Sequence, residues 1–237
     1  MVRFSVKYMP TALFSLKDSN STNSGAKSLF LPSPYSIKMA ILNQAITIGG
    51  ELYKLNEKGS LNFQFIRNAK ISYYLQQKSN FCVNNTFVKI LKIKENKSSR
   101  KDKEAGKEFK PGFKSDVSFR EYIHITQPIE IIFEVYDESA SQYLKKYLHC
   151  INYFGKRGCF FQFLEYNDNP AEANVVSFDV KKGLVGILQK YDDFDEKATF
   201  EMVNNFSGKA TKRKEEILVL PLKMIGSSKS YSKYKAI

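Results

Sequence analysis

The sequence has no tryptophan, and only two histidines and three cysteines among 237 residues. The cysteines, Cys82, Cys150 and Cys159, are far apart and form no C-x-x-C pair. This set excludes a zinc site, which needs about four clustered Cys and His ligands, and its odd number argues against a disulfide framework. Cys150 and Cys159 stand among apolar residues, so we expect inert core thiols.

The chain also has no long apolar run. A membrane-spanning helix needs roughly 18 or more apolar residues in succession, and no stretch approaches that length. The N-terminus shows no signal-peptide pattern. We therefore expect a cytoplasmic protein of a reducing compartment, with no membrane partner, no metal and no cofactor.

Positive charge, by contrast, is abundant and unevenly distributed. The 37 Lys and Arg against 24 Asp and Glu leave a net charge of +13. Residues 1–85 carry 10 basic and 3 acidic side chains, residues 86–129 carry 11 and 6, and residues 202–237 carry 8 and 2. Residues 130–201 reverse the sign, with 8 basic and 13 acidic side chains. This uneven charge has two possible explanations. It reflects a Lys-rich composition alone, or it marks a basic face that binds a polyanion.

Four segments of the first 166 residues are predicted to be strands. Apolar and polar side chains alternate over Val2–Tyr8 and over Pro128–Tyr136, with the period of two that a half-buried strand requires. An apolar run predicts a strand over Cys159–Leu164. Residues 63–73, where Phe63 and Phe65 alternate with polar neighbours, are predicted to be strand-rich.

Two helices are predicted between these strands. Ser33 is a suitable N-cap and Pro34 a suitable first helical residue, and Gly49-Gly50 is a typical helix end. The second helix is predicted over Ser139–Cys150, after a cap at Asp137 or Ser139. The apolar face expected for the first helix consists of Ile37, Ile41, Ala45 and Ile48.

A long polar hairpin is predicted between the second and third strands. Two strand-like arms, Phe87–Ile93 and Phe113–Arg120, flank residues 94–111, in which only Ala105 and Phe109 are apolar. A connection so long and polar within a compact domain is usually functional or disordered. We interpret it as a thumb that projects from the body. Its expected basic residues are Lys94, Lys97, Arg100, Lys101, Lys103, Lys107, Lys110 and Lys114.

Taken together, these elements predict an α+β fold. With the thumb treated as an insertion, their order is βαββαβ, the ferredoxin-like (RRM-like) arrangement. We expect this domain over residues 1–166 and a strand-rich part packed on it over residues 167–237. Strands are expected there at Val175–Val180, Leu184–Gln189 and Ile217–Leu220, followed by an extended tail from Gly226.

The loop Gly155-Lys156-Arg157-Gly158 is one candidate anion site. Its glycines let backbone N–H groups approach a phosphate closely, and its two cations neutralise the charge. It is not a nucleotide-binding P-loop, because it lacks G-x-x-x-x-G-K-[ST] and follows a helix. An ordinary turn is the alternative, and the place of the loop at the end of a predicted sheet favours a ligand.

The tail offers a second candidate set. Ser228, Lys229 and Tyr231 bring a hydroxyl, a cation and a stacking ring together, which suits phosphate and base contacts with single-stranded RNA. A frayed terminus would have the same composition.

A third set lies in the second arm of the thumb. Arg120, Tyr122 and His124 alternate and therefore share one face of a strand. They suit RNA binding or acid/base chemistry, and structural support of the hairpin base is preferred to catalysis. The acidic run Asp192–Glu196 is expected to be a solvated loop or a docking surface.

Four short motifs in order resemble one known family. They are Pro32–Ala40 at the first helix, Phe119–Tyr122 in the thumb, Asn152–Gly158, and Leu220–Leu222 with Ser227–Tyr231. Together they resemble the RAMP-superfamily subunit of type I CRISPR Cascade that holds the five-prime handle of the CRISPR RNA. The resemblance spans nearly the whole chain.

The resemblance implies a non-catalytic subunit of an antiviral ribonucleoprotein. Such a subunit binds and caps the CRISPR RNA handle, anchors the Cascade large and backbone subunits, and meets target DNA through the complex. Its thumb lies against the guide. The residues implied to bind RNA are Tyr35, Ser36 and Lys38 in the first helix, Gly155, Lys156, Arg157 and Gly158 in the loop, and Ser228, Lys229 and Tyr231 in the tail.

Two other functions stay open at this point. One variety of the family is a metal-independent endoribonuclease that processes precursor CRISPR RNA, and Tyr122, His124 and a nearby lysine would suit such chemistry. The other is a generic basic RNA-binding domain. That reading ranks last, because Gly155–Phe161 departs from the RNP aromatic signature.

Overall fold

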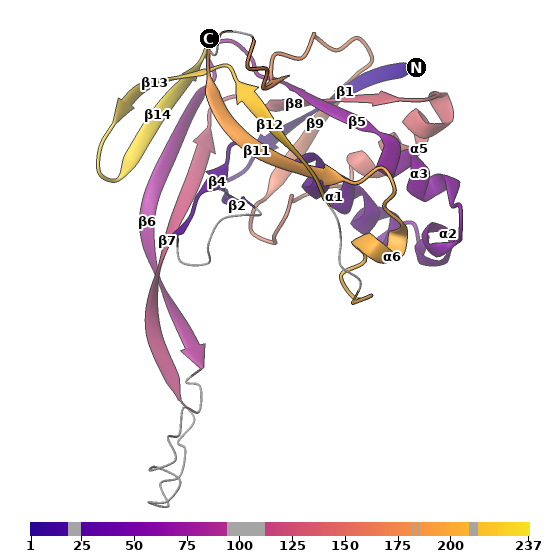
Figure 1. The fold of residues 1–237 in the computed structure, drawn as a ribbon, viewed down its shortest axis with the longest axis horizontal. Coiled ribbons are helices and arrows are strands. Elements are labelled where there is room, and N and C mark those ends of the chain that lie inside the picture. The colour runs from indigo at the N-terminus through magenta and orange to yellow at the C-terminus, as the bar shows by residue number, and fades with distance from the viewer. Residues whose placement is uncertain (19–24, 94–111, 182, 184, 209–212) are drawn as a thin grey trace, which may run out of the picture.

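The computed structural model describes residues 1–18, 25–93, 112–181, 183, 185–208 and 213–237. Figure 1 shows a body of helices and sheets from which one long hairpin projects, with a second, shorter hairpin beside its base. Strands and helices are both present and segregated, so the expected α+β class is confirmed.

One four-stranded antiparallel sheet carries the first strand at its centre. Its strands are β1 (Val2–Pro10), β5 (Lys70–Tyr74), β8 (Ile129–Val135) and β9 (Phe161–Asn167), in the order β5-β8-β1-β9. Each neighbouring pair is antiparallel. The alternation seen in the first segment therefore marks a strand, as expected.

Two helices pack against this sheet. They are α1 (Pro34–Thr47), capped by the Ser33 side chain, and α5 (Glu138–Leu148), capped by Asp137. Both starts agree with the expectation from the sequence. Ile48, expected on the apolar face of the first helix, is instead 63% exposed, because the helix ends one residue before it.

The stretch before β5 was expected to be strand-rich, and that expectation is wrong for residues 61–68. Two short helices, α2 (Leu52–Asn56) and α3 (Leu61–Asn68), occupy it. Ser60 caps α3 by accepting a hydrogen bond from the Phe63 N–H at 3.2 Å. Phe63 and Ile66, both buried, lie three residues apart on one helix face, so helical spacing prevails over the apparent alternation.

A five-stranded sheet contains the projecting hairpin. Its order is β13-β14-β6-β7-β3, with β13 (Leu222–Ser227), β14 (Tyr231–Ala236), β6 (Asn80–Ile93), β7 (Phe113–Ile125) and β3 (Gly25–Ala26). The predicted thumb arms are confirmed and extend further into the body than expected. The tail is a hairpin on β6 and not a single extended strand.

The remaining strands form two small sheets. One has the order β10-β12-β11, with β10 (Val176–Ser177), β12 (Arg213–Leu220) and β11 (Ile187–Phe194), and the other pairs β2 (Leu16–Lys17) with β4 (Ser28–Leu29). The strand expected over Leu184–Gln189 thus begins later and runs further. A four-residue helix, α6 (Phe200–Val203), follows β11.

A carboxylate holds the helices together. Glu51, at the start of α2, accepts hydrogen bonds from the Tyr143 and Tyr147 hydroxyls at 2.8 and 2.7 Å and from the Asn62 amide at 3.0 Å. Burial raises the pKa of Glu51, but the hydrogen bonds from both tyrosines and from the Lys146 ammonium outweigh burial and leave the pKa below its ordinary value.

The Glu51 cluster predicts a pH dependence of stability. A carboxylate whose pKa is depressed by folding stabilises the protein above its unfolded pKa of 4.5, and this contribution is lost as the pH falls further. We expect Glu51→Gln to lower the free energy of unfolding by about 2 kcal/mol at neutral pH. Urea unfolding at neutral pH and below pH 4.5 checks this. Equal pH dependence in both proteins would contradict it.

Candidate nucleic-acid interface

Three strands bring residues from the thumb and the tail onto one face. In the register of β14, β6 and β7, Asn84 stands opposite Tyr231 on one side and opposite Tyr122 on the other. Cys82 likewise stands between Lys233 and His124. Directly opposed side chains of antiparallel strands project to the same side. We call this side the outer face.

The opposite, inner face of these strands packs on the body. Phe81, Val83, Ile123 and Ile125 project to it, and each is at most 6% exposed. On the outer face His124, Tyr231 and Lys233 are exposed, whereas Asn84 and Tyr122 are half-buried. The outer face is therefore the one open to a ligand.

The outer face is strongly basic. It carries Lys223, Lys233 and Lys235, all exposed, and Arg120. Lys223 and Lys235 stand directly opposite each other, a like-charge pair that destabilises a sheet unless an anion lies over it. In β13, β14 and the adjoining parts of β6 and β7, the one acidic residue is Glu121, which belongs to the inner face and accepts from the Ser28 N–H at 2.8 Å.

The tail motif forms the turn beside this face. The Ser228 N–H donates to the Tyr231 carbonyl at 2.8 Å, and the Asn85 N–H of β6 donates to the Ser230 carbonyl at 2.7 Å. Ser228 and Lys229 therefore lie in a hydrogen-bonded turn at the base of the thumb, and both are exposed.

The loop Gly155–Gly158 is linked to β7 through the segment that contains Phe14 and Ser15. It is a tight turn with positive φ at Gly155 and Gly158, a conformation that favours glycine, and Lys156 and Arg157 are exposed. The Cys159 thiol after the turn is 3.3 Å from the Ser15 carbonyl. The preceding residue, Phe14, pairs with Ile123 of β7, so a single segment separates the loop from the thumb base.

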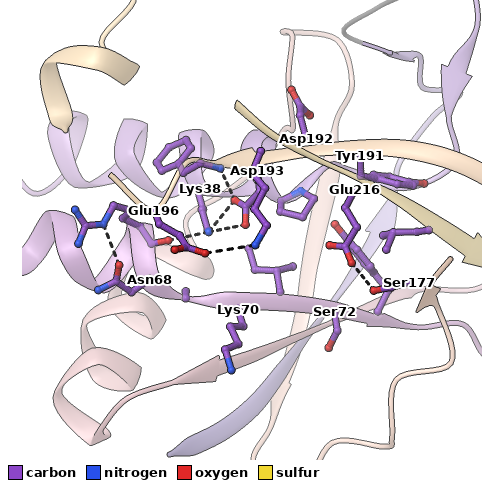
Figure 2. A pocket seen from close by; sticks show the side chains of 18 of the residues that line it. Lys38, Asn68, Lys70, Ser72, Ser177, Tyr191, Asp192, Asp193, Glu196 and Glu216 are labelled. Atoms are coloured by element: carbon purple, nitrogen blue, oxygen red, sulfur yellow. Dashed lines mark hydrogen bonds and ion pairs between the residues drawn. The ribbon is translucent and has the colours of Figure 1, made fainter. Parts of the chain in front are cut away.

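The first-helix residues lie elsewhere. Lys38 is 2% exposed, and its ammonium forms an ion pair with Asp193 of β11 at 2.7 Å and donates to the Arg67 carbonyl at 2.9 Å. Figure 2 shows this pair at a pocket of about 430 Å³ between β5 and β11. The ammonium is therefore not on the surface where the resemblance implied it. Burial lowers the pKa of Lys38 and raises that of Asp193.

Tyr35 and Ser36 also have structural partners. The Tyr35 ring packs edge-on against Phe194 at 5.2 Å, and the Arg213 guanidinium lies 3.8 Å from its centroid. The Ser36 hydroxyl donates to the Ser33 carbonyl at 2.8 Å. The structure does not bring the first-helix set to the outer face.

The acidic run was expected to be a solvated loop or a docking surface, and for its first two residues this is wrong. Asp192 and Asp193 belong to β11, where Asp192 is 6% exposed and pairs with Arg213 at 2.6 Å. Arg213 of β12 and Lys38 of α1 thus pair with the two aspartates.

The described part of the thumb has an apolar side. On the side that continues the inner face beyond the body, five apolar side chains are exposed by 55% or more, namely Phe87, Leu91, Ile93, Phe113 and Val117. The exposed Lys89 and Ser115 stand among them. Lys114 is exposed on the other side. The remaining predicted thumb cations, Lys94, Lys97, Arg100, Lys101, Lys103, Lys107 and Lys110, lie outside the described residues.

Sequence reasoning missed Lys223, Lys233, Lys235 and Asn84 as members of the site. Tyr231, Lys233 and Lys235 alternate, and this period of two predicts a strand with one basic-aromatic side. Asn84 has no such signal, because only the pairing of β6 with both neighbours places it between two tyrosines.

Two features are absent from the part of the chain that the structure describes, a cluster of metal ligands and a helix able to span a membrane. In the ranges described above, no group of three or more His, Cys, Asp or Glu side chains is placed to hold a metal ion. None of the described helices is both long and apolar enough to cross a bilayer.

Comparisons with known proteins found similarity among solved structures. No family model and no curated protein matches the chain. A CRISPR protein from Archaeoglobus fulgidus has a TM-score of 0.41 at 12% identity, over 100% of this chain and 92% of that one. A chain in the type III-B Cmr-beta complex bound to cognate target RNA has a TM-score of 0.38 at 11% identity, over 98% and 86%. The structures it resembles are thus CRISPR-associated, and scores this low assign no function.

Proposed function

We propose that this protein is a non-catalytic RNA-binding subunit of a CRISPR effector, of the type I Cascade class, that caps the five-prime handle of the CRISPR RNA. The observation that carries the proposal is the outer face, where three exposed lysines, Arg120 and two tyrosines share one side of a sheet. Cations neutralise phosphates, and aromatic rings stack on unpaired bases.

The fold supports the same proposal. The order β5-β8-β1-β9, with α1 and α5 as connections, supports a ferredoxin-like βαββαβ unit into which the thumb is inserted between β5 and β8. The CRISPR assignment itself rests on the four ordered sequence motifs. One of them, Ser227–Tyr231, belongs to the edge of the outer face.

The apolar side of the thumb supports the assembly part of the proposal. Phe87, Leu91, Ile93 and Phe113 are exposed on one side of the thumb, with Lys89 and Ser115 among them. Exposed apolar side chains that gather on one face commonly mark interaction sites. We assign these apolar side chains to the neighbouring Cascade subunit, while the outer face holds RNA.

Handle recognition is tested by filter binding of the purified chain to two RNAs of equal length, with and without the repeat-derived five-prime handle. We expect at least about 10-fold tighter binding to the handle RNA, since shape and splayed bases add to phosphate neutralisation. Equal affinity for both RNAs would reject handle specificity, and no binding to either would reject the RNA-binding proposal.

A second candidate function is metal-independent cleavage of precursor CRISPR RNA. On the outer face, His124 and Lys233 stand on either side of Cys82, and Tyr122 lies two residues before His124 in β7. This arrangement favours cleavage, since imidazole and ammonium groups are suitable acids and bases. Incubation with repeat RNA in EDTA decides between the two. Cleavage that His124→Ala abolishes would favour the enzyme, and intact RNA favours the non-catalytic subunit.

A further inference from the structure

We infer that the free edge of β5 is a docking site for an extended peptide segment of a partner protein, which adds to the sheet as a further strand and places a basic side chain beside Glu216. The cleft along this edge has a volume of about 430 Å³. None of its lining residues belongs to the outer face or to the thumb, so the site does not depend on RNA binding.

β5 is the outermost strand of its sheet, and its free edge borders the cleft. The order β5-β8-β1-β9 leaves one side of β5 without a neighbouring strand. Four successive residues, 70–73, line the cleft, whereas one face of a strand would contribute only alternate residues. Figure 2 shows Lys70 and Ser72 projecting to the side of β5 away from Asp193. The cleft therefore lies along the edge of the strand.

The chain itself covers one end of this edge. The N–H groups of Asn174 and Val175 donate to the Tyr73 carbonyl at 3.2 and 3.3 Å. The Asn174 side chain donates to the Leu75 carbonyl and accepts from the Leu75 N–H, both at 2.8 Å. The chain then leaves β5 and pairs with β12 as β10. The edge is thus covered at this end by extended backbone and by an amide that imitates it.

The rest of the edge presents unpaired backbone groups. In an antiparallel strand, the N–H and C=O of a residue point to one side, and those of the next residue point to the other. Tyr73 and Leu75 point away from β8, as their bonds to residues 174–175 show, and Ile71 therefore points the same way. No described residue pairs with the Ile71 N–H or C=O on this side. An added strand would satisfy both groups.

One carboxylate of the cleft has no cation beside it. Three of the four carboxylates form ion pairs, namely Asp192 with Arg213, Asp193 with Lys38 and Glu196 with Lys214. The fourth, Glu216, accepts from the Ser177 hydroxyl and has no cation among the described residues.

The cations that line the cleft already have acceptors. These are Asp193 for Lys38, Glu196 for Lys214, Glu134 for Lys70 and the Ala198 carbonyl for Arg67. The charge that the cleft still lacks is therefore positive, and a Lys or Arg side chain of the partner would supply it.

A residue of the added strand that stands opposite Ile71 would face Glu216. Directly opposed residues project to the same side of a sheet. Tyr73, which shares the Ile71 side of β5, packs on Tyr191 with ring centroids 6.2 Å apart. Glu216 stands directly opposite Tyr191 in the pairing of β11 with β12. The position opposite Ile71 is therefore the one that favours a basic residue.

Two labelled nonapeptides of alternating threonine and valine, one with a central arginine and one with a central glutamate, test the charge preference by fluorescence anisotropy. We expect the arginine peptide to bind about 5-fold more tightly, as one partly exposed ion pair allows, and Glu216→Gln to remove the difference. Glu215→Gln is the matched control, because neighbouring residues of β12 project to opposite faces, and it is expected to keep the preference.

Ile71→Pro tests the backbone contact. Proline removes the N–H that points away from β8 and leaves the ladder with β8 in place, so peptide affinity is expected to fall about 10-fold. Ile71→Val retains the N–H and is expected to bind as the unmodified chain does. Thermal unfolding checks that each variant is folded. Amide NMR of the unmodified chain gives a second measurement, in which added peptide is expected to shift the Ile71 resonance.

Four results would overturn the inference: no binding of either peptide, equal affinity for both, unchanged affinity in folded Ile71→Pro, or an Ile71 resonance that peptide does not shift. Self-association of the chain that Ile71→Pro abolishes would assign the edge to a second copy, and would also overturn it. Each of these results leaves the RNA-binding proposal intact, since handle RNA tests that separately.

Discussion

Replacing Lys223, Lys233 and Lys235 by glutamine is expected to weaken binding of single-stranded RNA about 100-fold in 0.1 M salt. Each phosphate contact on a single strand contributes about 0.7 to the slope of log K against log salt, so three contacts amount to about two decades between 0.1 M and 1 M. All three lysines are exposed, and none forms an ion pair with the described residues. A salt titration by anisotropy measures both effects.

The control for this triple variant removes the same charge elsewhere. Lys54, Lys58 and Lys197 are exposed and lie on or beside α2 and α6, away from the outer face. Their replacement by glutamine is expected to change affinity by no more than about 3-fold, as a loss of long-range attraction only. If the two triple variants weaken binding equally, overall charge and not the outer face binds the RNA.

Replacing Lys38 by methionine is expected to lower the free energy of unfolding by about 3 kcal/mol and to leave RNA affinity unchanged. The substitution removes the ion-pair partner of Asp193, and a largely buried charge left without its partner costs about 3–5 kcal/mol. Asp193 retains a hydrogen bond from the Phe194 N–H at 2.7 Å and some access to the pocket, which favours the lower value. Urea unfolding and RNA anisotropy measure the two properties.

A double variant separates the ion pair from the packing around it. Removing both charges, as Lys38→Met with Asp193→Leu, leaves no unpaired charge, and the free energy of unfolding is expected to return to within about 1 kcal/mol of the unmodified chain. A Lys38→Met protein with normal stability but lost RNA binding would instead support the RNA contact that the sequence resemblance implied.

The difference between Lys38 and Tyr231 shows how far local sequence reasoning reaches. Both were expected to contact RNA from short motifs. Lys38 meets Asp193, 155 residues further along the chain, and is neutralised there, whereas Tyr231 pairs with β6 and stays on an exposed face. Nothing within a few residues of either position distinguishes these outcomes, because each depends on a partner from a distant segment.

The misassigned helix has a different cause. Phe63 and Phe65 alternate, but Phe63 and Ile66 also satisfy helical spacing, and the Ser60 cap decides between the two patterns. The cap was visible in the sequence as a serine three residues before the phenylalanine. Short apolar segments satisfy both periods, so capping is the stronger indicator there.

By itself the sequence determined the net charge of +13, the start of α1 at Ser33-Pro34, the arms of the thumb and the α+β class. Each of these depends on composition or on neighbours within one or two turns. The tertiary structure alone decided that Asn84 lies between Tyr231 and Tyr122 and that Lys38 is buried. Strand pairing and burial depend on contacts between segments far apart in the chain. Such contacts produce no periodic pattern in the local sequence, so the sequence alone does not predict them.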